Sequence, residues 1–151
     1  MLENYEINKS TLALIPIEKN KTIVHELENE FIVNQTPFEI INESCKYFGS
    51  SYYGRFEGTK KMVGYNYKSP IIIEDTNRII FFPTSSPRLN NCAWISLKYV
   101  KDYYKNNNES IIIFTNNLNL NLNISYNILE NQILRATKLL CTLDKICEKM
   151  N

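Results

Sequence analysis

The C-terminal segment constrains the fold more strongly than any other part of this sequence. From residue 129 onward, apolar side chains recur at alternating spacings of four and three residues, the period of one face of an α-helix. Asn127, with Glu130 three residues later, fits an N-cap and capping box. We therefore expect a long helix that packs on a sheet or, in part, pairs with a second subunit. The apolar stripe consists of Leu129, Ile133, Ala136, Leu140, Leu143, Cys147 and Met150.

The rest of the chain indicates short strands and two helical segments. Apolar runs around the turns 18–21 and 27–30 predict strands, and the runs within 71–82 and 111–124 predict two antiparallel hairpins. A helical stripe begins at Pro37, and a short helix can follow across 52–62. The segment 92–104 mixes strand and helix signals. We expect a single domain over residues 1–151 with an α+β fold: antiparallel β-hairpins or a sheet, a helical insertion near residues 37–62, and the long C-terminal helix.

Composition bears on several classes of function. There is no apolar run of about 18 residues and no secretory signal pattern, so we expect a cytoplasmic protein with no membrane partner. The four cysteines form no CxxC pair, and His25 is the single histidine, which argues against zinc and for reduced thiols. No phosphate-loop, dinucleotide-binding or nucleophile-elbow motif occurs. We therefore predict no enzyme activity, no metal and no cofactor.

All four glycines of the chain fall between Gly49 and Gly64, in a segment rich in hydroxyl groups and cations. Glycine lets backbone N–H groups approach a ligand closely and permits positive φ angles. Hydroxyl groups and cations beside such a backbone suit phosphate oxygens. The competing interpretation is a tight structural crossover. The candidate phosphate contacts in this segment are Ser50, Ser51, Arg55, Lys60 and Lys61.

Three more cations are candidates outside that segment. The net charge of +1 is low for a nucleic-acid-binding protein, so DNA binding would depend on where the charges lie. Arg88 lies in a Ser/Pro/Asn loop, where it is either simply exposed or placed to enter a narrow A·T minor groove. Arg135 and Lys138 flank the C-terminal helix and could contact phosphate or a neighbouring subunit.

Several ordered motifs resemble one family. "SCKYFGSSYYGR" at 44–55 and Gly58-Thr59 are followed by "SPIII", "IIFFPTSS", "CAWIS" and "ISYNILENQILRA". Together they are similar to the competence transcription factor family, ComK, over nearly the whole chain. The resemblance implies a cytoplasmic activator of DNA-uptake genes that binds paired AT-rich boxes of double-stranded DNA, largely from the minor groove. It also implies dimers that assemble into tetramers, and control by an adaptor of the MecA type that delivers the protein to a Clp protease.

This sequence departs from the family pattern in two respects. Typical members continue for a few dozen residues, often basic ones, beyond the matched helix, whereas we expect this chain to lack that C-terminal tail. Its net charge is also low for the class. The alternative hypothesis is therefore a shortened family member that acts as an interaction protein, through mixed oligomers with a full-length relative, without activating transcription.

Overall fold

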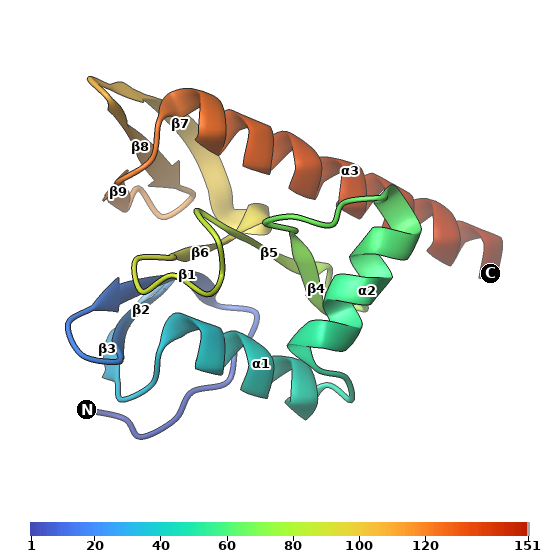
Figure 1. Ribbon diagram of the computed structural model, residues 1–151, viewed down its shortest axis with the longest axis horizontal. Coiled ribbons are helices and arrows are strands. Elements are labelled where there is room, and N and C mark those ends of the chain that lie inside the picture. Colours follow the sequence, from blue (N-terminus) through green and yellow to red (C-terminus); the bar gives the residue numbers. More distant parts are fainter. Residues whose placement is uncertain (151) are drawn as a thin grey trace.

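The computed structural model describes residues 1–150 and contains a larger and a smaller antiparallel sheet (Figure 1). The larger sheet has the order β3-β2-β1-β6-β5-β4, and the smaller has the order β7-β8-β9. The larger sheet comprises β1 (Thr11–Ile17), β2 (Lys21–Glu26), β3 (Glu30–Val33), β4 (Ile71–Glu74), β5 (Ile79–Pro83) and β6 (Trp94–Ser96). The smaller comprises β7 (Val100–Asn106), β8 (Glu109–Phe114) and β9 (Asn119–Leu122).

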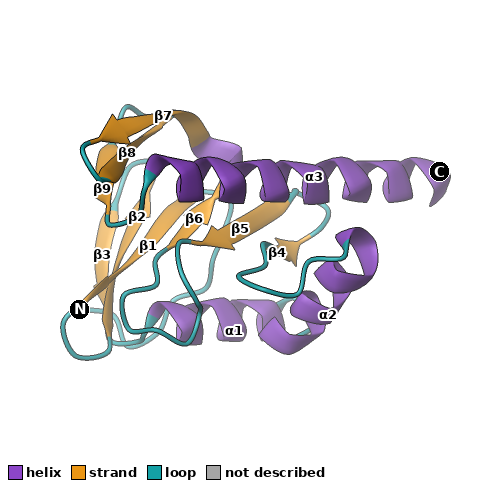
Figure 2. Cartoon of the chain, turned by 45° about the horizontal axis from the view of Figure 1, so that its top comes forward, coloured by secondary structure: helices purple, strands orange, loops and turns teal. Residues whose placement is uncertain are grey.

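Three helices cover these sheets: α1 (Pro37–Tyr47), α2 (Tyr52–Val63) and α3 (Tyr126–Met150). Figure 2 shows α3 on one side of the larger sheet and α1 with α2 on the other. The α+β fold, with a helical insertion near residues 37–62 and a long C-terminal helix, is thus confirmed. No helix among residues 1–150 is long and apolar enough to cross a membrane.

The central strands of the larger sheet are buried on both faces, and the two-residue period of the strands divides the side chains between two cores. Ile71, Ile73 and Phe81 belong to the core that includes α1, with Trp94 at its centre. Their neighbours Ile72 and Phe82 belong to the core shared with the smaller sheet and α3. The run Ile71 to Ile73 is therefore apolar throughout, because β4 has a core on either side.

Local sequence signals explain where α1 begins and ends. The Thr36 hydroxyl accepts a hydrogen bond of 3.1 Å from the Glu39 backbone N–H, and the Glu39 carboxylate accepts one from the Thr36 backbone N–H at 3.3 Å. This reciprocal pair is a capping box, and Pro37 occupies the first turn. The helix ends at Phe48, after which Gly49 has φ of +89°, a left-handed conformation that favours glycine.

The long helix differs in detail from the prediction. It begins one residue before Asn127, and the Ser125 hydroxyl accepts a hydrogen bond of 3.2 Å from the Ile128 backbone N–H, so the predicted N-cap was wrong. Leu139 is fully buried, whereas Leu140 is only half-buried and Met150 is 81% exposed. The buried face rotates towards Leu139 because the helix packs against both sheets, and its last turn extends beyond them (Figure 1).

The segment 92–104, which mixed strand and helix signals, passes from the larger sheet to the smaller one within a few residues. Strand β6 closes the centre of the larger sheet, a single 3-10 turn follows at Leu97–Tyr99, and β7 then joins the smaller sheet. The predicted second hairpin, β8 with β9, is confirmed, and β7 adds a third strand to it.

Candidate nucleic-acid interface

The glycine-rich segment contains the connection between α1 and α2 and the whole of α2. Ser51 is the N-cap of α2, and its hydroxyl oxygen accepts a hydrogen bond of 2.9 Å from the Gly54 backbone N–H. A Cβ atom at Gly54 would lie 2.6 Å from the Ser50 hydroxyl oxygen and 3.3 Å from that of Ser51. Gly49 and Gly54 therefore allow two helices to follow each other with almost no linker, which gives the glycines a structural reason.

The cations of this segment have different surroundings. Lys60 and Lys61 are exposed in the last turn of α2, where positive charge is favourable beside the free carbonyl groups. Arg55 is half-buried, and its Nε has no hydrogen-bond partner among the described residues. Its charge acts on Cys45: burial raises the pKa of that thiol to about 11, and Arg55 opposes the rise. The Nε atom of Arg55 is therefore buried on the side of α2 that faces α1.

Arg88 is exposed on a loop whose two ends are held together. The Thr84 backbone N–H donates to the Ala93 carbonyl oxygen at 2.9 Å, and the Ala93 N–H donates to the Thr84 hydroxyl at 3.0 Å. Within the loop, the Leu89 N–H donates to the Ser86 carbonyl at 3.0 Å. These bonds anchor both ends of the loop at β5 and β6, so the backbone that carries Arg88 is held in position.

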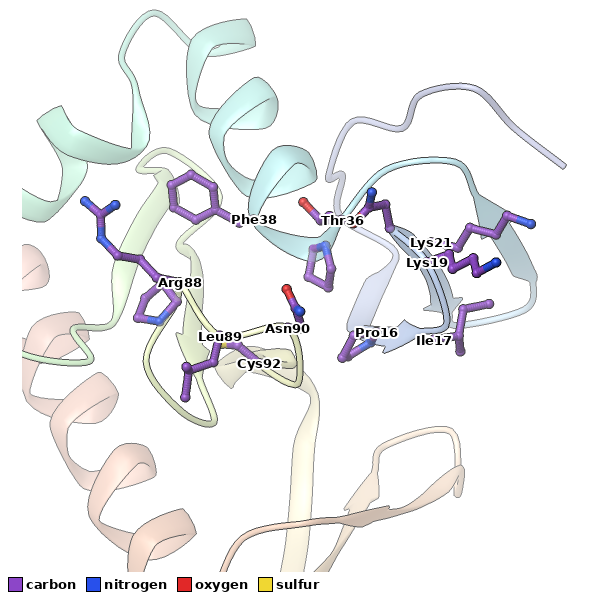
Figure 3. Close-up of a pocket in the computed structure, with 13 residues that line it drawn as sticks. Pro16, Ile17, Lys19, Lys21, Thr36, Phe38, Arg88, Leu89, Asn90 and Cys92 are labelled. Carbon is purple, nitrogen blue, oxygen red and sulfur yellow. The ribbon is translucent and has the colours of Figure 1, made fainter.

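One cavity lies between this loop, the β1–β2 turn and the start of α1. Its volume is about 400 Å³, and its cations are Lys19, Lys21 and Arg88 (Figure 3). Figure 3 shows the two lysines at one end, while the guanidinium of Arg88 lies near Phe38 at the other. Lys19 and the adjacent Asn20 have positive φ angles of 44° and 61°, as a tight hairpin turn requires.

A second cavity, of about 520 Å³, lies on the other side of Arg88, against α1 and α2. Its cations are Lys46, Lys68 and again Arg88, and Ser51 also contributes to the wall. Lys46 lies 3.7 Å from the exposed carboxylate of Glu43, an exposed pair that contributes little to binding or stability. No Asp or Glu lines either cavity, although the chain contains 16 acidic residues. Arg88 on the loop and four lysines around it therefore line the two cavities, with no acidic residue in either wall.

Helix α3 fixes the segment that carries Lys68. The buried Gln132 side-chain amide donates hydrogen bonds to the carbonyl oxygens of Lys68 at 2.9 Å and Pro83 at 2.7 Å. Arg135 donates to the carbonyl oxygens of Tyr67 at 2.7 Å and Lys68 at 3.1 Å, and to the Gln132 amide oxygen at 2.6 Å. Its guanidinium also lies 4.4 Å from the centre of the Tyr65 ring. Burial lowers the pKa of Arg135, and Tyr65 opposes that shift.

The structure brings together only some of the residues predicted from the sequence. Ser51 and Arg88 line the same cavity. The cavity walls do not include Ser50, Arg55, Lys60, Lys61, Arg135 or Lys138, and the Lys138 ammonium lies 6.0 Å from the Tyr65 ring centre. Sequence reasoning missed Lys19, Lys21, Lys46 and Lys68 as members of the face. Two lysines at a predicted hairpin turn, "EKNK", were a usable signal, because a turn exposes its side chains.

This geometry defines a class of protein before any comparison. It is an α+β protein whose exposed Arg88 lies between two cavities that have cations and no acidic residue in their walls, a surface suited to a polyanion. Among residues 1–150, no group of three His, Cys, Asp or Glu side chains could hold a metal ion.

Comparison with known proteins identifies the family. Residues 2–148 match the ComK protein family. The chain is also 38% identical over 139 residues to the competence transcription factor of Bacillus subtilis (strain 168), an alignment that covers 89% of this chain and 72% of that relative. The chain belongs to the ComK family. No solved structure matches the chain.

Proposed function

We propose that this protein is a cytoplasmic transcriptional activator of competence genes that binds paired AT-rich boxes of double-stranded DNA, mainly through the minor groove. The observation that carries the proposal is the position of Arg88. It is exposed on a loop whose ends are joined by hydrogen bonds, between two cavities with no acidic residue in their walls. An arginine inserted into a narrow A·T minor groove meets the most negative potential that duplex DNA offers. Membership in the ComK family agrees with this function.

The cations on either side of Arg88 fit the geometry of a groove. A minor groove is about 6 Å wide and has a phosphate backbone along each edge. Lys19 and Lys21 lie on one side of Arg88, and Lys46 and Lys68 lie on the other. We assign these two pairs to the two backbones, together with the Ser51 hydroxyl. Such contacts position the protein on the duplex, while groove width supplies the sequence preference.

The residues predicted from the sequence then have distinct proposed roles. Lys60, Lys61 and Lys138 are exposed and remain candidates for phosphate at the edge of the face. Ser50 lies in the α1–α2 connection and Arg55 in the first turn of α2. Because the Arg55 Nε is buried, we assign only the outer end of its guanidinium to phosphate. Arg135 already donates to three oxygen atoms, so we assign it to positioning Lys68.

We further propose that the active form is a dimer that assembles into tetramers, and that a MecA-type adaptor with a Clp protease controls its level. Helix α3 supports the first part, because Leu134, Ile146 and Met150 on it are 59%, 40% and 81% exposed. Exposed apolar side chains of this size on one helix are available for contact with a second chain. Analytical ultracentrifugation tests this part: a Leu134→Lys substitution should shift the protein towards the monomer, whereas a wild-type protein that is already monomeric would refute it.

DNA binding is tested by titration of a duplex with phased A/T boxes against a duplex in which G·C pairs replace the boxes. We expect preference for the A/T duplex and a log–log salt slope of several units, because each neutralised phosphate contributes about 0.9. Lys21→Ala should lower that slope by about one for both duplexes. Lys105→Ala, an exposed lysine on β7, is the matched control and should leave the slope unchanged. Equal binding of both duplexes at low salt would refute the proposal.

A further inference from the structure

The second cavity carries a feature that contacts with a DNA backbone do not explain. In addition to its cations, its wall contains five aromatic side chains: Phe38, Tyr52, Tyr53, Phe56 and Tyr67. Phosphate contacts require hydrogen-bond donors and cations, and aromatic rings supply neither at their faces. A wall that combines aromatic rings with cations is instead typical of sites that bind unpaired nucleotides, where each base stacks on a ring and each phosphate meets a positive charge.

The exposure of the aromatic rings increases from the core towards the surface. Tyr52 lies at the inner end, with its ring centre 4.8 Å from that of Phe38 and 6.2 Å from that of the buried Trp94, both edge-on. Tyr53 lies further out and stacks near Phe56, with ring centres 6.2 Å apart. Tyr53 is nevertheless 68% exposed. The inner rings are therefore fixed by packing, and the outer ring keeps a face free.

Tyr67 lines the same cavity from the segment that α3 holds. Tyr67 is 66% exposed, and the Lys68 ammonium lies 5.5 Å from its ring centre. The carbonyl oxygens of Tyr67 and Lys68 are bound by Arg135, so this aromatic–cation pair is held on a rigid support. Two exposed tyrosines therefore line one cavity, and each offers a ring on which a base can stack.

The dimensions and polar groups of the cavity also fit a nucleotide. Its volume of about 520 Å³ lies inside the range of about 300–1,000 Å³ that small-molecule sites occupy. Asn42 lines the wall, and its side-chain oxygen accepts a hydrogen bond of 2.9 Å from the Tyr52 backbone N–H. That bond fixes the amide and leaves its NH₂ group as a donor for the edge of a base.

We propose that this cavity binds an unstacked nucleotide. The base stacks against Tyr53 and Tyr67, and the phosphate meets the positive charges of Lys46, Lys68 and Arg88. This goes beyond the duplex binding proposed above, because a base inside a duplex cannot enter the cavity. The nucleotide can be a free one or one unpaired member of a single strand. Arg88 lines both cavities, so an occupied nucleotide site competes with the duplex for that arginine.

The experiment uses three probes with the full chain: dAMP, a single-stranded deoxyadenosine 12-mer, and deoxyribose 5-phosphate, which has the charge without the base. Calorimetry and ligand-detected NMR should show saturable binding of dAMP, of the 12-mer, or of both, and much weaker binding of deoxyribose 5-phosphate. Binding of the 12-mer alone assigns the site to single strands. Equal binding of all three, or binding of none, would overturn the proposal.

Variants separate this site from the duplex contacts. Tyr53→Ala and Tyr67→Ala should each weaken nucleotide binding about 5- to 100-fold, the range expected for loss of one stacking partner. Tyr53→Phe should restore it, since stacking needs the ring and not the hydroxyl. Tyr104→Ala, which removes a tyrosine 43% exposed on β7, is the control and should have no effect. Affinity for the A/T duplex should remain within about twofold in Tyr53→Ala. Equal losses in Tyr53→Ala and Tyr104→Ala would overturn the assignment.

Discussion

Arg135 in the middle of α3 donates a hydrogen bond of 3.1 Å to the carbonyl oxygen of Lys68, a residue that lies 67 positions earlier in the chain. This bond joins the core-forming helix to the wall of the cationic face. Because Gln132 beside it also binds the Pro83 carbonyl at the end of β5, one turn of α3 holds both the Lys68 segment and the base of the Arg88 loop. The face is thus supported from behind by a helix that lines neither cavity.

The first prediction concerns this support. Arg135→Ala removes charge-assisted hydrogen bonds to two carbonyl groups and leaves the buried Gln132 with fewer partners, so we expect the free energy of unfolding to fall by about 1–3 kcal/mol. Lys138→Ala is the matched control, since Lys138 is exposed and only approaches the Tyr65 ring. Urea unfolding followed by circular dichroism measures both variants. Equal stability of the two would show that the Arg135 bonds are not structural.

Two glycines of the glycine-rich segment, one after α1 and one inside α2, allow a paired test. Gly49→Ala places a side chain at a φ of +89°, and we expect a loss of about 1–2 kcal/mol. Gly58 lies inside α2 with no atom within 4 Å of an added Cβ, so Gly58→Ala should stabilise the protein by about 0.5–1 kcal/mol. Thermal unfolding checks both changes. Shifts of the same sign in the two variants would contradict this account of the connection.

The third prediction concerns pH. Burial lowers the pKa of His25 from its usual 6.5, and Glu30, whose carboxylate lies 3.6 Å away, opposes that shift. The unfolded chain therefore binds a proton at a higher pH than the folded one, so His25 lowers stability as the pH falls below about 6.5. We expect the difference in Tm between pH 7.5 and pH 5.5 to be smaller in His25→Gln than in the wild type. An identical pH dependence would exclude His25 as a contributor.

Arg55 provides a test with two independent measurements. Its Nε is buried without a partner, so Arg55→Met, which keeps the apolar stem, should not reduce the free energy of unfolding. If the outer end of the guanidinium reaches phosphate, the same variant should lower the salt slope of duplex binding by about 0.9. An unchanged slope would remove Arg55 from the proposed DNA contacts, and a large loss of stability would show that the inner guanidinium is structural.

Much of the fold was readable from the sequence because its signals are local. Pro37 at the start of α1, the apolar run of Ile71 to Ile73 and the apolar stripe of α3 each depend on neighbouring residues. The start of α3 was misplaced because Ser125 and Asn127 are both competent caps, and packing rather than propensity decides between them. Strand order was not readable, since the pairing of β1 with β6 joins residues some 80 positions apart.

The candidate site was only partly predictable for the same reason. Arg88 was identifiable as a lone cation in a polar loop. Its neighbours Lys21 and Lys46 come from a hairpin turn and from the end of α1, and only the folded chain brings them to one face. Arg135, a candidate for phosphate by its charge alone, proved to be bound to backbone carbonyl oxygens, which no sequence pattern indicates.

The central claim is that the protein reads A·T boxes from the minor groove with Arg88. Inosine·cytosine pairs separate the two grooves: they present the A·T pattern in the minor groove and the G·C pattern in the major groove, because inosine lacks only the guanine N2 amino group. The decisive measurement is the affinity for a duplex whose boxes carry inosine·cytosine pairs, with wild type and Arg88→Ala. We predict that the wild type binds this duplex about as tightly as it binds A·T boxes, and that Arg88→Ala loses this affinity. Affinity as low as that for G·C boxes would contradict minor-groove recognition.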